Sequence, residues 1–279
     1  MKVLVTGATG FIGRYLIDDL ECAGIDYVTL GRSGPSSEEH IQFDLLSDED
    51  LVGHIKRIKP THLIHMAWYA EHGKYWESSL NIGWLAATSR LVEAFCQSGG
   101  KHVVITGTCA EYDWRYGYCV EDLTPLVPKT LYGISKNSAR SITDQICKKY
   151  GAGLAWARIF FPYGLGESPD RLIPSLFSVF RGEKQAFGVN ASFYRDLLHA
   201  SDVARAISIC SQKKVQGDIN ISSAEPLSLR AIVNQVASIF KKSSDIVLSL
   251  ESSRLGEPGF LLGENEKIKA HGWAQKISI

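Results

Sequence analysis

Three things that the sequence lacks narrow the range of functions. No apolar run is long enough to span a bilayer, and the N-terminal one is too short for a signal peptide, so we expect a cytoplasmic protein. No charge is in excess, because 30 lysines and arginines balance 30 aspartates and glutamates, and we therefore expect neither a nucleic-acid nor a membrane partner. No C-x-x-C pair occurs among the six scattered cysteines, which predicts reduced thiols and no metal site.

The remaining composition is typical of a globular protein. Hydrophobic residues make up 45% and charged residues 22% of the 279 positions. This allows a large core in one large or two modest domains. The information about function therefore lies in short motifs.

A glycine turn stands between the first strand and the first helix that the sequence predicts. Residues 2–6 form a short β-branched apolar run, and an apolar helical pattern begins at Phe11. The glycines between and after them allow a tight turn, a close approach of a pyrophosphate, and close packing of helix on strand. The phosphates would lie at the helix N-terminus, where free N–H groups favour an anion. The predicted dinucleotide contacts are Gly7, Thr9, Gly10, Phe11, Ile12 and Gly13.

The residues after the second predicted strand indicate which dinucleotide is bound. Residues 26–30 form this strand, and Gly31 and Arg32 follow where an acidic side chain would bind the ribose 2′-hydroxyl. Arg32 offers a fork of donors suited to a phosphate, so we expect NADP(H) in preference to NAD(H). The alternative is that Arg32 is only a solvated loop residue. Asp44 and Leu45 follow a third strand and are expected near the adenine.

The sequence predicts two further apolar strands, at residues 62–66 and 102–106, and a long helix over about 80–97 between them in the chain. Five strands separated by helices predict an α/β fold with a doubly wound parallel sheet of the Rossmann type. Ligands lie at the carboxyl ends of such strands, which places Ala67 on the same rim as the glycine turn. The aromatic and polar stretch 69–77 is expected to be a loop over the pocket.

A hydroxyl and a Tyr-x-x-x-Lys spacing point to the chemistry. Thr108 comes just after the fifth strand, and Tyr132 and Lys136 stand four apart in the next predicted helix, so they share one face. Taken alone, this spacing is also compatible with an exposed tyrosine above a solvated lysine. Its position behind a dinucleotide turn and a hydroxyl favours a catalytic site.

The ordered motifs resemble the extended short-chain dehydrogenase/reductases, the group of nucleotide-sugar epimerases, dehydratases and ketoreductases. The resemblance covers nearly the whole chain. The motifs that carry it are Gly7-x-x-Gly10-x-x-Gly13, Asp44-Leu45, His65-Met66-Ala67, Asn81, Thr108, Tyr132-x-x-x-Lys136, and segments 158–164, 195–202, 220–222 and 272–273.

The resemblance implies roles for three catalytic residues. Tyr132 would exchange a proton with the reacting oxygen, and Thr108 would hydrogen-bond the same oxygen. Lys136 would hold the nicotinamide ribose. Together with the nicotinamide charge, it would also lower the pKa of Tyr132 from its usual value near 10.

The resemblance also implies a division of the chain. Residues 1–160, with a returning segment about 191–221, would bind the cofactor, and residues 161–190 and 222–279 would form a smaller C-terminal substrate-binding lobe. A homodimer is expected through the helix after Leu80 and the helix that bears Tyr132.

Three residues are expected to contact the substrate. Arg195 would bind its phosphates, the alternative being a surface arginine or one paired with Asp196. Trp68 would face the sugar, or else pack against other aromatic residues such as Trp114, and Glu111 is the third candidate. Relatives often carry an asparagine where Phe161-Pro162 stands here, so a usual diphosphate contact is missing or replaced.

These features favour NADPH-dependent reduction of a nucleotide-activated sugar, expected to be a 4-keto-6-deoxy sugar. The alternative is a nucleotide-sugar 4-epimerase, which would retain bound NAD. Less favoured are a dehydratase, because Cys109 and Ala110 stand where an Asp-Glu pair is needed, and a non-enzymatic cofactor-sensing protein.

Overall fold

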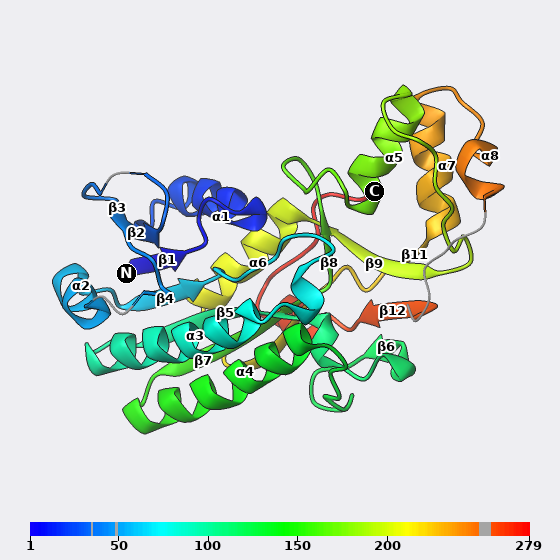
Figure 1. Cartoon of the computed structure of the whole chain (residues 1–279). Helices are drawn as coiled ribbons and strands as arrows, with labels where there is room; N and C mark the ends of the chain where they lie inside the picture. Colours follow the sequence, from blue (N-terminus) through cyan, green and yellow to red (C-terminus); the bar gives the residue numbers. More distant parts are fainter. Residues whose placement is uncertain (35, 48–49, 251–257) are drawn as a thin grey trace.

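The centre of the molecule is a seven-stranded, fully parallel sheet (Figure 1). The computed structural model describes residues 1–34, 36–47, 50–250 and 258–279. In spatial order the strands are β10 (Gly217–Ile221), β7 (Gly153–Ile159), β5 (His102–Thr108), β4 (His62–His65), β1 (Lys2–Thr6), β2 (Asp26–Gly31) and β3 (His40–Gln42). The direction of winding reverses between β1 and β4, where a crevice forms at the carboxyl ends. The predicted Rossmann-type sheet is confirmed, with β7 and β10 as two strands that the sequence did not reveal.

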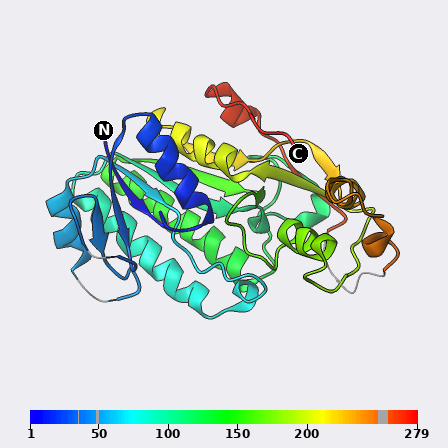
Figure 2. The same cartoon turned by 90° about the horizontal axis from the view of Figure 1, so that it is seen from above.

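Helices cover both faces of this sheet, as the view from above shows (Figure 2). On one face lie α1 (Phe11–Cys22) and α6 (Ala200–Gln212); on the other lie α2 (Leu51–Ile58), α3 (Leu80–Gln97) and α4 (Leu131–Tyr150). Side chains alternate along β1, so that Val3 and Val5 pack toward α1 while Leu4 packs toward α3. Burial on both faces explains why the strands are continuous apolar runs rather than alternating ones.

A second, smaller sheet and its helices lie on the right side of Figure 1, with the helices α5 (Leu172–Arg181), α7 (Leu229–Ile239) and α8 (Asp245–Leu248) at the upper right. A separate core unites α5 and α7 with the strand residues that face them. The strands are β11 (Pro226–Ser228), β9 (Tyr194–His199), β12 (Phe260–Gly263) and β6 (Tyr118–Cys119), with β8 (Phe161–Tyr163) beside β9. The helices of the lobe are α5, α7 and α8. Helix α9 (Glu266–Ala270) packs instead beside β10, with Ile268 in the core of the large sheet.

Several predicted boundaries agree with the structure, and one differs in a way that matters. Helix α3 covers the predicted residues 80–97, and the loop 69–77 contains one short 3₁₀ turn, η1 (Tyr75–Glu77). Strand β5 continues to Thr108, two residues beyond its predicted end, because it pairs with β7 along its whole length. Thr108 is therefore held in a strand rather than in a loop. Among the described residues, no helix is long and apolar enough to cross a membrane.

Candidate functional site

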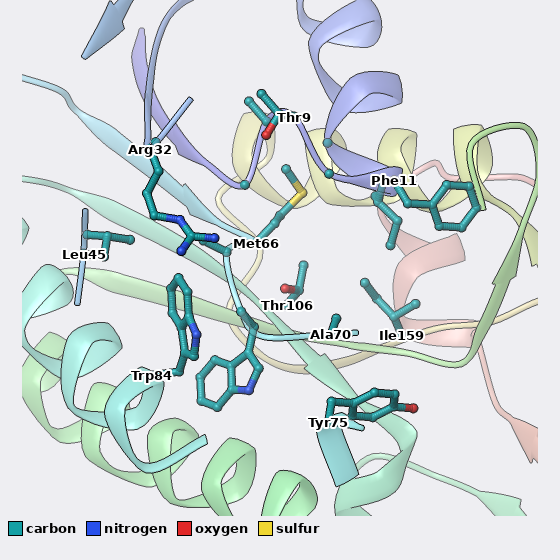
Figure 3. A pocket seen from close by; sticks show the side chains of 18 of the residues that line it. Thr9, Phe11, Arg32, Leu45, Met66, Ala70, Tyr75, Trp84, Thr106 and Ile159 are labelled. Atoms are coloured by element: carbon teal, nitrogen blue, oxygen red, sulfur yellow. The ribbon is translucent and has the colours of Figure 1, made fainter. Parts of the chain in front are cut away.

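A cavity of ≈ 530 Å³ lies at the carboxyl ends of β1, β2, β4 and β5 (Figure 3). It collects predicted residues from six separate segments of the sequence. All eleven predicted cofactor contacts and all three predicted catalytic residues line it, and so does Trp68: Gly7, Thr9, Gly10, Phe11, Ile12, Gly13, Arg32, Asp44, Leu45, Ala67, Trp68, Thr108, Tyr132 and Lys136. Glu111 and Arg195 do not line it.

The glycine turn has the shape that a pyrophosphate requires. Gly7 has φ +78°, and a Cβ there would lie 2.7 Å from the backbone N of Ala67. A Cβ on Gly13 would lie 2.1 Å from the carbonyl oxygen of Gly7, so only glycine lets α1 pack on this turn. At Gly10 a Cβ would meet only the Gly7 carbonyl at 3.1 Å, and no side chain caps α1 there. The first amides of α1 are thus available to an anion, which fits a dinucleotide.

The adenosine end of the cavity carries a cation. Arg32 follows β2, and Figure 3 shows its side chain extending across the cavity toward Trp84. Asp44 Oδ1 accepts a hydrogen bond from the Leu46 amide at 3.0 Å, so that carboxylate is occupied by its own turn. The exposed guanidinium of Arg32 suits a ribose 2′-phosphate.

Thr108 is held rigidly at the end of β5. Its amide donates to Glu111 Oε1 at 2.8 Å, and its hydroxyl accepts from the Ala110 amide at 3.2 Å. These bonds form a capping box that starts the 3₁₀ turn η2 (Cys109–Glu111). Thr108 lines the cavity, where its hydroxyl can hydrogen-bond a bound oxygen.

The predicted Tyr-x-x-x-Lys pair lies on the cavity side of α4. Thr130 caps this helix by accepting from the Gly133 amide at 3.1 Å. A Cβ on Gly133 would lie 2.5 Å from the Ala110 carbonyl, so glycine is what allows α4 to approach the turn after Thr108. Lys136 Nζ donates to the Thr106 carbonyl at 2.8 Å. The three predicted catalytic side chains are thus brought together by a close contact that the sequence did not reveal.

The ionisation of this pair depends on its burial. Burial raises the pKa of Tyr132, only partly opposed by a hydrogen bond with Thr108. Burial lowers the pKa of Lys136 to about 7, against a smaller opposing effect of the Glu111 charge. In the protein without cofactor, desolvation dominates the pKa of both groups. The prediction that Lys136 and the nicotinamide charge together lower the pKa of Tyr132 stays a prediction.

Glu111 is not placed as a substrate contact, and that prediction is wrong. Its side chain is 0% exposed, and Oε2 accepts from Arg158 Nε at 2.7 Å. Trp156 Nε1 donates to the same carboxylate, at 3.0 Å to Oε1 and 2.9 Å to Oε2. A carboxylate buried among these donors has no surface for a ligand. Its role is to hold the Thr108 backbone.

Arg195 lies away from the cavity, in β9. Its Nη1 donates to the carbonyl oxygens of Tyr194 and Pro258, both at 2.8 Å, and its guanidinium stands 5.6 Å from the rings of Phe161 and Phe193. It is not paired with Asp196, whose carboxylate accepts from other backbone groups. Its contact with substrate phosphates stays a prediction.

The cavity contains a second arginine that the sequence interpretation missed. Arg171 lines the cavity at the start of α5, with Nε donating to Glu167 Oε1 at 2.6 Å and Nη2 3.4 Å from the Pro162 carbonyl. It thus stands beside the Phe161-Pro162 segment that departs from the usual pattern. Its place at a helix N-cap gave no sequence signal, since such positions prefer small polar residues.

Aromatic side chains surround Tyr132. The ring of Tyr75 lies edge-on to that of Tyr132 at 4.8 Å, and Trp76 lies at 5.8 Å. Trp114 packs against Trp76 at 6.2 Å, while Trp68 stacks on Trp84 at 6.3 Å. Trp68 therefore lines the cavity and packs against Trp84 rather than Trp114. Its contact with a sugar stays a prediction.

Comparisons with known proteins agree with this geometry. The sequence model described as "NAD dependent epimerase/dehydratase family" matches residues 3–222. The chain is 26% identical over 255 residues to the dTDP-6-deoxy-L-talose 4-dehydrogenase (NAD(+)) of Aggregatibacter actinomycetemcomitans, covering 84% of this chain and 89% of that protein. It is 25% identical to the UDP-glucose 4-epimerase of Streptomyces lividans, covering 84% and 80%.

Solved structures match the whole chain. MoeE5 in complex with UDP-glucose and NAD has a TM-score of 0.83 at 26% identity, covering 100% of this chain and 95% of that one. The Thermus thermophilus UDP-glucose 4-epimerase in complex with NAD has a TM-score of 0.85 at 23% identity, with coverages of 100% and 95%, and shows the fold alone.

Proposed function

The chain belongs to the NAD dependent epimerase/dehydratase family, and from that premise we propose that it catalyses the NADPH-dependent reduction of a nucleotide-activated 4-keto-6-deoxy sugar. The observation that carries the choice is Arg32, whose guanidinium lies in the adenosine end of the cavity. A 2′-phosphate bound there distinguishes NADPH, the usual reductant, from NAD. The relative named as a 4-dehydrogenase of a 6-deoxy sugar supports the same reaction class.

Three side chains divide the work of the proposed reduction. The bound cofactor supplies the hydride. Tyr132 donates the proton to the substrate oxygen, and the Thr108 hydroxyl stabilises the charge that develops on it. Because burial raises the pKa of Tyr132, losing this proton requires a positive charge nearby. Lys136, one turn along the same face, provides that charge when protonated.

The walls near Tyr132 support a deoxy sugar as the substrate. Tyr75 lines the cavity and presents aromatic surface beside Tyr132, which suits an apolar methyl group better than a hydroxymethyl group. Arg171 lines the same cavity and can supply the cationic contact to substrate phosphates that Phe161-Pro162 does not.

The second candidate is a nucleotide-sugar 4-epimerase. Two observations favour it: the Streptomyces lividans relative carries that name, and MoeE5 was solved with UDP-glucose and NAD. A dehydratase is disfavoured further by the site, because Cys109 is buried and its pKa is raised by that burial. A thiol in this state cannot serve as the acid or base of an elimination.

Two assays separate the candidates. A reductase oxidises NADPH with a 4-keto-6-deoxy nucleotide sugar, which is followed by the loss of NADPH absorbance and abolished in Tyr132→Phe. An epimerase instead converts UDP-glucose to UDP-galactose with no net change in the cofactor. Epimerisation without NADPH turnover would reject the reductase assignment, and activity that persists in Tyr132→Phe would reject the catalytic assignment.

We also propose that residues 1–160 and 191–221 form the cofactor-binding domain, and that residues 161–190 and 222–279 form the substrate-binding lobe. We propose a cytoplasmic location for the protein. We further propose that it forms a homodimer through α3 and α4. The exposed Ile82 (58%), Ile134 (47%) and Ile142 (42%) of these helices support the dimer. Light scattering during size-exclusion chromatography tests it, and an Ile134→Asp variant should be a monomer.

A further inference from the structure

Lys136 has an unusual environment for a buried ammonium group. Its side chain is 3% exposed, and Nζ donates one proton to the Thr106 carbonyl at 2.8 Å. Within the part of the chain that the structure describes, no carboxylate forms an ion pair with it. A desolvated cation needs some other source of negative potential to remain charged.

The indole ring of Trp68 supplies that potential. Lys136 Nζ lies over the Trp68 ring, 4.1 Å from its centroid. The π-face of an indole is electron-rich, and its attraction for a cation is stronger when the cation is desolvated, as Lys136 is at 3% exposure. Unlike a carboxylate, an aromatic ring lowers the cost of the charge without taking a proton from the lysine.

Trp68 is itself held in place by a buried amide. Its Nε1 donates to Asn81 Oδ1 at 2.8 Å. Asn81 is 0% exposed, and its Nδ2 donates to the carbonyl oxygens of Tyr75 at 2.7 Å and Ser78 at 2.9 Å. One amide therefore orients the ring that packs on Lys136 and the backbone of Tyr75, whose ring packs on the catalytic tyrosine.

We propose that Trp68, oriented by Asn81, is a positioning residue that keeps the Lys136 ammonium charged and in place for the reaction. The proposal rests on the proposed function only in giving the Lys136 charge a part in the reaction. The contact itself is a property of the protein, so it can be tested without substrate or cofactor.

Other titratable groups near Lys136 also influence its charge. Glu111, from the turn after β5, raises the pKa of Lys136, although its carboxylate is shared with Arg158. His65, from β4, has its pKa lowered by burial and by Lys136, and is therefore neutral near pH 7. Tyr132 lies on the same face of α4 and is neutral because burial raises its pKa. Burial lowers the pKa of Lys136 itself to about 7, so small changes in its surroundings alter its charge near neutrality.

The test is an NMR titration of the protein labelled with ¹³C-lysine, with the Lys136 signal assigned from its absence in Lys136→Met. Trp68→Leu keeps an apolar group but removes the π-face, and should lower the midpoint of Lys136 by about one pH unit. Trp68→Phe keeps an aromatic face and should restore most of that shift. A midpoint that is the same in wild type and Trp68→Leu would overturn the proposal.

A second variant covers the case in which Trp68→Leu does not fold. Trp68→Met fills the space with a flexible chain that has no ring, and the same downward shift is expected. An unshifted midpoint in a folded Trp68→Met protein would also overturn the proposal. The titration needs neither substrate nor cofactor, so it can be interpreted even if the reductase assay shows no activity. A wrong function would appear in the reductase assay, and a wrong positioning role would appear as an unshifted Lys136 midpoint.

Discussion

Two buried cations of this protein are held in opposite ways. Arg158 is 0% exposed and pairs with Glu111 at 2.7 Å and with Asp218 at 3.0 Å. Lys136 is 3% exposed and has a carbonyl and an aromatic ring instead. Burial acts to lower both pKa values, but the charges around Arg158 reverse the effect and raise its pKa, whereas the pKa of Lys136 falls to about 7.

The difference separates a structural charge from a reactive one. An arginine satisfied by two carboxylates cannot change its charge at any working pH, so it contributes to the architecture that holds Thr108. A lysine without a carboxylate is balanced between charged and neutral forms, which is what proton transfer needs.

The largest effect is expected for Lys136→Met. Turnover should fall by at least about 1000-fold, since the charge that assists Tyr132 is lost. The free energy of unfolding should not decrease, because a desolvated ammonium is replaced by an apolar side chain of similar length. Steady-state kinetics and urea denaturation measure the two quantities. Lys148→Met, at an exposed position of the same helix, is the control and should retain activity.

Breaking the ion pair between Glu111 and Arg158 should instead lower the free energy of unfolding. Glu111→Gln leaves the buried guanidinium of Arg158 short of a counter-charge, and the free energy of unfolding should fall by about 3–5 kcal/mol. Urea denaturation is the measurement. The matched control is Asp144→Asn, which breaks the exposed pair with Lys148 at 2.7 Å and should cost less than about 1 kcal/mol. Equal losses in the two variants would contradict the comparison.

A buried histidine next to Lys136 should make the fold sensitive to acid. His65 lies between the hydroxyls of Thr6 at 2.6 Å and Thr88 at 2.9 Å, and burial lowers its pKa to about 3. Its unfolded pKa is near 6.5, so its contribution to stability is complete above pH 6.5 and is lost as the pH falls toward 3. By pH 4.5 this loss should reach about 3 kcal/mol. Urea denaturation across this range should show a smaller slope for His65→Gln than for wild type.

The smallest effect concerns an exposed cation. Arg32→Ala should weaken the binding of NADPH by about tenfold and leave that of NADH unchanged, because only NADPH presents the 2′-phosphate. Fluorescence titration with both cofactors measures the two dissociation constants. Tighter binding of NADH than of NADPH by the wild type would reject the proposed cofactor preference.

Much of the cofactor site could be predicted from the sequence because its signals are local. The turn from Gly7 to Gly13 needs particular residues within seven positions, and Tyr132 and Lys136 share a face through the helical period alone. The prediction failed where a side chain had several possible partners. Glu111 is three residues from Thr108, yet its burial depends on Trp156 and Arg158.

The same reason explains the residues that were missed. Nothing near Arg171 in the chain indicates that it reaches the cavity, since that depends on how α5 packs against the segment around Pro162. Gly133 gave only a weak indication of close packing, as a glycine in the first turn of a helix directly after Tyr132. Its meaning became clear only from the short distance to Ala110.

Local sequence was enough to predict the glycine turn, the order of the first five strands, and the shared face of Tyr132 and Lys136, since each depends on contacts within a few residues. Only the tertiary structure decided the ionisation of Lys136, because its charge depends on burial and on Trp68, a residue from another strand's end. It likewise decided that Arg158 is a structural charge, by bringing Glu111 and Asp218 to it from distant parts of the chain. Electrostatic energies in a desolvated interior are set by neighbours in space, and the chain order does not reveal those neighbours.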